Sequence, residues 1–147
     1  MNADDTRLLR LAYNEAEAGY KEGGCPIGSV LARGGEVLAQ GRNQRVQNGD
    51  PIAHGEMDAL RKAGRQKTYR DTTLYTSLSP CMMCSGTIIQ FGIPRVIVGE
   101  NINFGGNEDF LRSKGIEVII VDDPACRALM HRFIEENPKL WAEDIAE

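Results

Sequence analysis

Apolar side chains recur along the chain with two alternating periods, one typical of helices and one typical of strands. From Asp5 to Lys21 they return every three or four positions, and the stripe stops at a Gly-Gly pair, which predicts an amphipathic helix. Ile27–Ala32 and Glu36–Gly41 are short β-prone runs joined through Arg-Gly-Gly. Because glycine readily adopts positive φ, these two runs predict an antiparallel hairpin.

Strand-like and helix-like segments alternate through the rest of the chain. A helix is predicted over Gly55–Ala63, a strand over Thr72–Ser77, and a second helix between Pro80 and Gly92. Arg95–Val98 and Glu117–Val121 are continuous apolar runs of strand length. Such runs are typical of central strands that helices cover on both faces.

The remaining segments complete an alternating order of elements. A loop and a short helix are predicted between the last two strands, and a long helix from Pro124 to the break at Asn137-Pro138. Parallel strands need helical crossovers. The order therefore predicts a single α/β domain over residues 1–147, a three-layer α/β/α sandwich around a mixed five-stranded sheet.

Composition and charge narrow the class of protein. A chain of 147 residues, 41% hydrophobic and 26% charged, can form one globular core without disulfides. Its net charge of −4 should repel a polyanion, so we expect a small uncharged ligand and no nucleic acid. No run approaches the roughly 20 apolar residues of a membrane span, and the N-terminus lacks the apolar core of a secretory signal. A cytoplasmic protein that does not bind membranes is expected.

Two of the four cysteines lie in a pattern that indicates a catalytic metal. His54-Gly-Glu56 is followed 23 residues later by Pro-Cys81-Met-Met-Cys84. His54, Cys81 and Cys84 are ligands of the kind that Zn²⁺ takes, and three protein ligands leave the fourth tetrahedral position for water. Glu56 is then free to move protons. This pairing of H-x-E with P-C-x-x-C is the signature of zinc nucleobase deaminases.

Other interpretations of the CxxC pair fit less well. A redox pair would not need the upstream His-Gly-Glu, and a closed structural zinc site would need a fourth Cys or His ligand. Cys25 and Cys126 are solitary and are expected to be small buried hydrophobic residues. A non-catalytic, zinc-stabilised binding module remains the alternative outside enzymes.

The predicted elements make the ligand spacing physically sensible. Cys81 and Cys84 are three apart at the start of a helix, where both sulfurs can point to one side and free N–H groups favour thiolates. His54 starts the neighbouring helix, so two helix N-termini should converge on one metal near the carboxyl ends of strands. Glu56 would take a proton from the attacking water, deliver it to a ring nitrogen, and then protonate the departing amine.

The resemblance extends well beyond the metal motif. AGYKEGGCPIG, RNQRVQNG, HGEMDAL, GENINF, VIIVDD and the C-terminal WAEDIAE resemble the small zinc cytosine deaminases of the yeast type over nearly the whole chain. The metal motif is shared by the cytidine-deaminase-like superfamily, whereas GENINF and WAEDI are specific to the free-base branch. The resemblance implies a homodimeric hydrolase with one Zn²⁺ per chain that converts cytosine to uracil and ammonia in pyrimidine salvage.

The same resemblance implies which residues bind the base. Asn43 matches the asparagine that hydrogen-bonds the pyrimidine ring, and Asp144 matches the carboxylate that receives the exocyclic amine. Phe104 and Trp141 match aromatic walls that cover the base. Two further expected substrate contacts are Gly55 and Ser79. From the sequence alone, the two aromatic residues could equally be core or interface residues, and Asp144 could be an exposed acid of the tail.

Two positions depart from the family pattern and leave the substrate open. Met82 stands where yeast-type members have an acidic residue, and Ala142 where they have a second tail aromatic. A wider pocket mouth could admit a substituted pyrimidine, a triazine, isocytosine, guanine, isoguanine or another purine. A tRNA-adenosine enzyme shares the metal motif, but it should show a basic face that this chain does not suggest.

Overall fold

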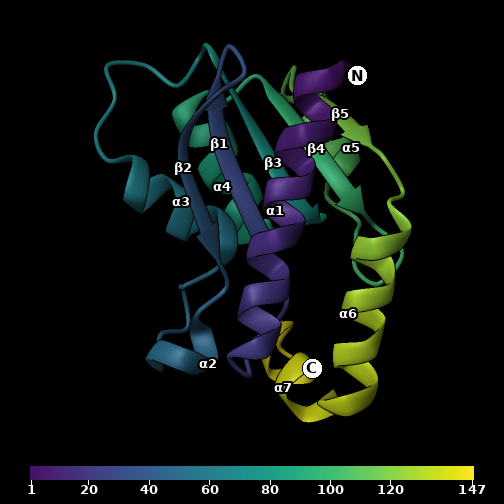
Figure 1. Ribbon diagram of the computed structural model, residues 1–147. Helices are drawn as coiled ribbons and strands as arrows, with labels where there is room; N and C mark the ends of the chain where they lie inside the picture. The colour runs from purple at the N-terminus through teal and green to yellow at the C-terminus, as the bar shows by residue number, and fades with distance from the viewer.

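The computed structural model describes residues 1–147 and contains one five-stranded mixed sheet (Figure 1). The strands lie in the order β2-β1-β3-β4-β5. Strand β1 is antiparallel to both β2 and β3, whereas β3, β4 and β5 run parallel to one another. The predicted mixed sheet is therefore confirmed, with the bounds β1 Gly28–Arg33, β2 Glu36–Arg42, β3 Thr72–Leu78, β4 Arg95–Glu100 and β5 Glu117–Ile120.

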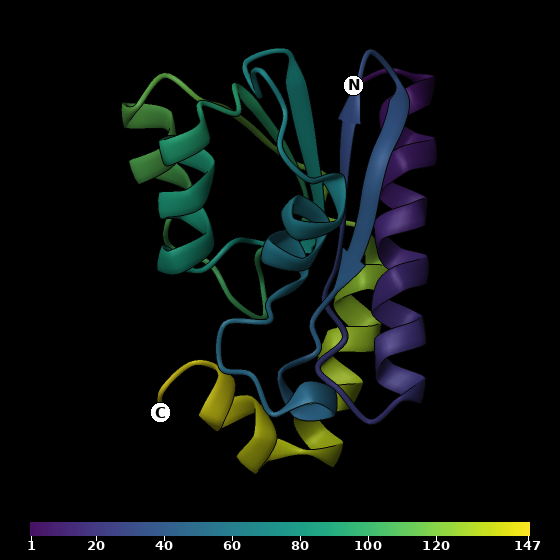
Figure 2. The same ribbon diagram turned by 90° about the vertical axis from the view of Figure 1, so that its left-hand side faces the viewer.

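Helices cover both faces of the sheet, which confirms the predicted three layers. Helices α1 (Ala3–Lys21) and α6 (Pro124–Glu136) lie on one face, and α3 (Gly55–Ala63), α4 (Met82–Phe91) and α5 (Glu108–Ser113) lie on the other (Figure 2). Each face has its own apolar core. The core under α1 includes Leu8, Val30 and Ile97, and the core under α3, α4 and α5 includes Leu74, Ile88 and Val96.

One strand differs in position from the prediction. Strand β5 is the edge strand of the sheet, and only β4 of the two apolar runs is central. The apolar run of β5 arises because both of its faces are still covered: Val118 and Ile120 pack into one core, and Ile119 packs into the other. Burial on two faces is visible in the sequence, but the place of the strand in the sheet is not.

Two short helices were not predicted. Helix α2 (Arg45–Asn48) follows β2, and helix α7 (Pro138–Asp144) forms most of the final segment. Both lie at the lower end of the molecule in Figure 1, below the sheet. The predicted hairpin is present, and its loop residues Gly34 and Gly35 have φ values of 57° and 82°, which only glycine adopts readily.

A close helix–sheet contact positions the start of α3. A Cβ at Gly41 of β2 would lie 2.4 Å from the backbone nitrogen of Ala59 in α3, so only glycine permits this approach. Helix α3 therefore lies directly against the sheet, with His54 and Glu56 at its N-terminal end. None of the helices has the length and apolar character needed to cross a membrane.

A buried ion pair joins the N-terminal helix to the centre of the sheet. Arg95 of β4 donates to both carboxylate oxygens of Asp5, at 2.8 and 2.7 Å. The Tyr75 hydroxyl of β3 donates to the same carboxylate at 2.6 Å. The Arg95 guanidinium holds the pKa of Asp5 well below its usual range, so this carboxylate is ionised in the folded protein.

Asp5→Asn should destabilise the fold in a pH-dependent way. Removing one partner of a buried charged pair is expected to lower the free energy of unfolding by roughly 2–4 kcal/mol at neutral pH. Because the folded-state pKa is depressed, this stabilisation is present above the unfolded-state pKa of about 3.9 and is lost as the pH falls below it. Urea denaturation of wild type and variant should therefore differ at neutral pH and converge in acid.

The neighbouring Asp4 offers a matched control. Its carboxylate is exposed and pairs with Arg7 on the surface, so Asp4→Asn should change the stability by less than about 1 kcal/mol. An Asp5→Asn variant that is as stable as Asp4→Asn at neutral pH would contradict a stabilising role for the ion pair of Asp5 with Arg95.

Candidate active site

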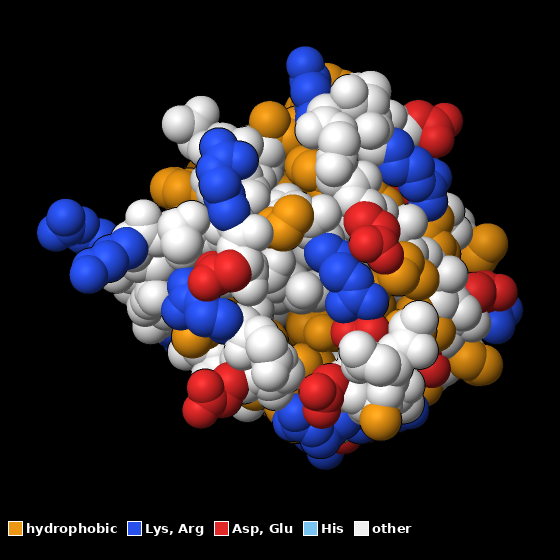
Figure 3. Space-filling view, turned by 90° about the horizontal axis from the view of Figure 1, so that it is seen from above, with side chains coloured by type: hydrophobic (Ala, Val, Ile, Leu, Met, Phe, Trp, Pro, Cys, Tyr) orange, Lys and Arg blue, Asp and Glu red, His pale blue; other side chains and the backbone are white.

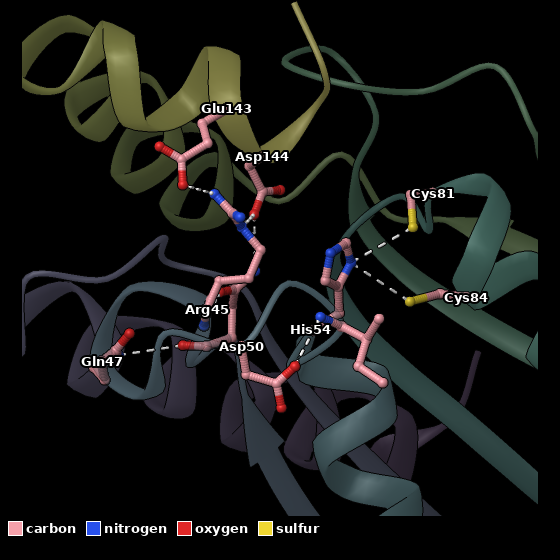
Figure 4. Close-up of polar contacts among 10 residues, drawn as sticks. Arg45, Gln47, Asp50, His54, Cys81, Cys84, Glu143 and Asp144 are labelled. Carbon is pink, nitrogen blue, oxygen red and sulfur yellow. Dashed lines mark hydrogen bonds and ion pairs between the residues drawn. The ribbon is translucent and has the colours of Figure 1, made fainter.

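Three side chains from two helix starts form a metal-ligating cluster. His54 is the N-cap of α3, Cys81 is the N-cap of α4, and Cys84 lies in the first turn of α4. Their ligand atoms all lie within 4.8 Å of one another. His54 Nδ1 faces both sulfurs, at 3.5 Å from Cys81 Sγ and 3.8 Å from Cys84 Sγ (Figure 4).

The cluster fits a zinc ion. Bond lengths of about 2.3 Å to sulfur and about 2.0–2.1 Å to nitrogen in a tetrahedron place these ligand atoms about 3.5 Å apart, which matches the two N–S distances. The donor set of two sulfurs and one imidazole nitrogen is also one that zinc favours. Three protein ligands leave one position open, as in catalytic zinc sites.

The two cysteines have different proton affinities. Hydrogen bonding from Cys84 to Cys81 lowers the pKa of the Cys81 thiol to about 4, and the same contact raises the pKa of Cys84. The contact with Cys81 also raises the pKa of His54. One ligand is therefore already a thiolate at neutral pH, as metal binding requires.

Glu56 lies beside the cluster without belonging to it. Its side chain is buried in the first turn of α3 and lines the same cavity as His54 and Cys81. Burial, together with the neighbouring Cys81 sulfur, raises the pKa of Glu56 to about 7. A carboxyl group with a pKa near neutrality can both accept and donate a proton during one reaction cycle.

The cluster and Glu56 open into a mainly apolar cavity of about 410 Å³. Four of the residues expected to contact the base line this cavity: Ser79, Phe104, Trp141 and Asp144. The Phe104 and Trp141 rings meet edge to face, with centroids 6.2 Å apart. Trp141 and Asp144 belong to α7, so the C-terminal helix forms one wall of the cavity.

Two carboxylates order the loop that carries Phe104. Glu100, fully buried at the end of β4, accepts hydrogen bonds from the backbone N–H groups of Ile102 and Asn103. Glu108 accepts from the Ser79 hydroxyl at 2.8 Å and from the Gly106 N–H. The loop is thus tied at both of its ends, and its Phe104 side chain is held at the cavity.

Asn43 and Gly55 lie behind the cavity wall. The Asn43 amide is fully buried, donates to Asp144 Oδ1 at 3.2 Å, and accepts from the backbone N–H of Arg45 at 3.0 Å. Gly55 is buried at the start of α3. Their expected contacts with the base stay predictions. Of the two departures from the family pattern, Met82 lines the cavity with its side chain largely exposed, whereas Ala142 is not among the lining residues.

Two polar residues at the site were missed from the sequence. Arg45 forms ion pairs with Asp144 and Glu143 of α7, and Asn107 lines the cavity and donates to the Pro80 carbonyl at 3.0 Å. Arg45 stands two positions after Asn43 in RNQR, but an arginine in a polar segment of the sequence carries no signal that distinguishes it from a solvated one.

Comparison with known proteins identifies the family. The model of the cytidine and deoxycytidylate deaminase zinc-binding region matches residues 2–100, which include all three ligands and Glu56. The chain belongs to this deaminase family. The His54, Cys81 and Cys84 cluster is its zinc-binding triad.

Individual relatives extend this comparison. The chain is 49% identical to a cytosine deaminase of Candida albicans over the full length of both proteins. It is 38% identical to a tRNA-specific adenosine deaminase of Streptococcus pyogenes, over 70% of this chain and 67% of that protein. A guanine deaminase structure from Nitrosomonas europaea shares the fold, with a TM-score of 0.74 and 22% identity over 86% of this chain and 82% of that one.

Cys84→Ala should abolish stable zinc binding. Loss of an outer hydrogen-bond partner of a metal ligand already weakens binding by about 10–100-fold, so loss of a ligand itself should weaken it by more than about 100-fold. Competition with a chromophoric chelator measures the affinity. Cys126→Ala is the matched control, because Cys126 is also a buried thiol but lies on α6; equal zinc affinity in the two variants would contradict the assigned ligand set.

Proposed function

We propose that this protein is a zinc-dependent hydrolase that deaminates free cytosine to uracil and ammonia. The observation that carries the proposal is the composition of one apolar cavity, which joins the metal triad and the buried Glu56 to Asp144 and Trp141 of the C-terminal helix. The full-length match to the Candida cytosine deaminase includes this helix. A base placed there would have polar groups at its edge and aromatic rings against its faces.

The reaction assigns a separate role to each group. Bound zinc would supply a Lewis acid that activates water at neutral pH. Glu56 accepts a proton from the attacking water and passes it to the ring nitrogen beside the amino-bearing carbon. It then takes the remaining proton of the added hydroxyl group and gives it to the amino group, which leaves as ammonia while the carbonyl of uracil forms. Asp144 accepts a hydrogen bond from the amino group and so orients it. The aromatic pair of Phe104 and Trp141 excludes water from the base.

Charge favours a free base over tRNA as the substrate. The net charge is −4, and Arg45, which contacts the cavity residue Asp144, is already paired with two carboxylates. On the end of the molecule opposite α7, Lys and Arg side chains are interspersed with Asp and Glu (Figure 3). Positive charge is the main source of affinity for a nucleic acid, and this chain has no excess of it.

One catalytic domain spans residues 1–147 in this proposal. The family match ends at residue 100, but the following residues supply β5 to the same sheet and α7 to the same cavity. All four cysteines are free thiols, which agrees with the reducing cytoplasm that we propose as the compartment.

We also propose that the protein is a homodimer that associates through the outer surface of α3 and α4. A groove of about 700 Å³ lies between these helices and residues 64–70. Its lining combines the apolar residues Met57, Leu60, Tyr69 and Phe91 with the basic residues Arg61, Arg65, Lys67 and Arg70. Phe91 is 47% exposed although it is a large apolar residue. A second copy of the chain that covered this surface would remove the Phe91 ring from water. The same two helices carry the metal ligands at their N-terminal ends.

A panel of free bases should show strong preference for cytosine. We expect the zinc-loaded protein to release ammonia from cytosine at least about 100-fold faster, in kcat/KM, than from isocytosine, guanine or adenine, because each misplaced polar group leaves a buried partner unpaired. Ultraviolet absorbance and an ammonia assay measure the rates. Preference for a purine, a triazine or a tRNA anticodon stem would overturn cytosine as the substrate.

The same assay on Glu56→Gln tests the chemistry. The amide cannot transfer protons, so kcat should fall by about 10²–10⁴-fold or more while one zinc per chain is retained. A fully active Glu56→Gln protein would exclude the proposed proton shuttle and would leave the binding-module interpretation in place.

Phe91→Arg should convert the dimer to a monomer. A charge placed in a buried interface cannot be paired, and it should weaken association by at least about 100-fold. Light scattering coupled to size exclusion gives the mass. Phe110→Arg is the control, because Phe110 is 40% exposed on α5, outside the groove; a wild-type protein with the mass of one chain would refute the dimer.

A further inference from the structure

We propose that Arg45 is a positioning residue of the deamination, which holds Asp144 so that one carboxylate oxygen is presented to the amino group of the substrate. The inference rests on the proposed function, since it assigns the acceptor for the exocyclic amine. It concerns a residue that neither lines the cavity nor belongs to the metal motif.

The contact between the two residues is close and shielded from water. Arg45 Nε lies 2.9 Å from Asp144 Oδ1, and the two residues are 99 positions apart in the chain. Their side chains are 11% and 6% exposed. The Coulomb attraction between two charges is larger in such a shielded position than on the surface, and removing one partner leaves the other as a poorly solvated charge.

Asn43 completes a closed set of contacts around the same oxygen. Its amide donates to Asp144 Oδ1, and its carbonyl oxygen accepts the backbone N–H of Arg45. Two donors therefore converge on Oδ1, and no protein group donates to Oδ2. In Figure 4 the second oxygen of Asp144 points away from Arg45, toward the side of the site that holds His54 and the cysteines. Since Asp144 lines the cavity, Oδ2 is the oxygen left for a ligand.

The guanidinium also determines what this oxygen can accept. Arginine is a donor only, and the carboxylate that it holds is an acceptor only. A carboxylate therefore binds an amino group, because the amino group donates a hydrogen bond. It repels a carbonyl oxygen, because that oxygen has no hydrogen to donate. Substrate and product of the proposed reaction differ in this respect, because cytosine carries an amino group where uracil carries a carbonyl. Asp144 held by Arg45 therefore favours substrate over product.

The outer contact of Arg45 is expected to matter less. Its Nη2 lies 3.0 Å from Glu143 Oε1, but the Glu143 side chain is 63% exposed. Exposed pairs contribute little because water and salt screen them. Glu143 is also absent from the cavity lining, so the two contacts of Arg45 can be tested separately.

The experiment compares Arg45→Met, Arg45→Lys and Glu143→Gln in the zinc-loaded protein. For Arg45→Met we expect KM for cytosine to rise by about 10–100-fold, the loss typical of one hydrogen bond to a charged group. Product inhibition by uracil should change by less than about 3-fold, because uracil makes no favourable contact with this carboxylate. The ratio of KM for cytosine to the inhibition constant of uracil is therefore the quantity that tests the inference.

The other two variants separate charge from geometry. Arg45→Lys keeps the positive charge but not the planar guanidinium, so it should recover part of the lost affinity. Glu143→Gln should stay within about 2-fold of wild type for both ligands. Zinc content and the melting temperature, measured for every variant, show whether the fold is intact.

Several outcomes would overturn the inference. An unchanged KM for cytosine in Arg45→Met would remove any role for Arg45. Equal weakening of cytosine and uracil would show that Arg45 only docks the C-terminal helix and does not orient the acceptor.

A second measurement does not depend on the substrate. Trp141 is the only tryptophan of the chain and lies on α7 with Asp144, so its fluorescence reports on this helix in the ligand-free protein. Arg45→Met should shift the emission to the red and increase quenching by acrylamide. If wild-type protein does not deaminate cytosine, the proposed function fails, and unchanged Trp141 emission in the variant would independently refute the contact.

Discussion

The structure depends on the meeting of two helix N-termini at one end of a sheet. Helices α3 and α4 begin at His54 and Cys81, whose ligand atoms must come within a few ångström of one another to share a cation. Neither helix can bring the three ligand atoms together alone. Strand β3 ends just before the start of α4, and the close contact between α3 and Gly41 of β2 holds α3 against the sheet. The packed sheet thus serves as the rigid support of the site.

The site has a second half that comes from a different part of the chain. The motif helices supply the metal ligands and Glu56, whereas the loop after β4 and helix α7 supply the aromatic pair and Asp144. In the proposed function, chemistry and recognition are therefore separated along the sequence, so the recognising residues can change while the metal motif stays the same.

Local signals predicted the metal triad and most of the fold. The spacing of His54, Glu56, Cys81 and Cys84 carries its chemistry within a short segment, and hydrophobic periods identified the main helices and strands. Helix α7 was missed because Asn137-Pro138 was interpreted as a break, although proline is also favoured in the first turn of a helix. The edge position of β5 and the pairing of Arg45 with Asp144 were missed for a different reason. The strand order and this ion pair both depend on which segments that are far apart in the sequence come together, and no local sequence pattern encodes such contacts.

The tied loop between Glu100 and Glu108 bears on how the cavity can be entered. Because the backbone of this loop is bonded at both ends to carboxylates, moving it would expose several N–H groups and two acids at once. Helix α7 instead reaches Arg45 on the other side of the site through side-chain contacts of Glu143 and Asp144. One wall of the cavity is therefore held by bonds to the backbone, and the wall opposite to it is held by side chains.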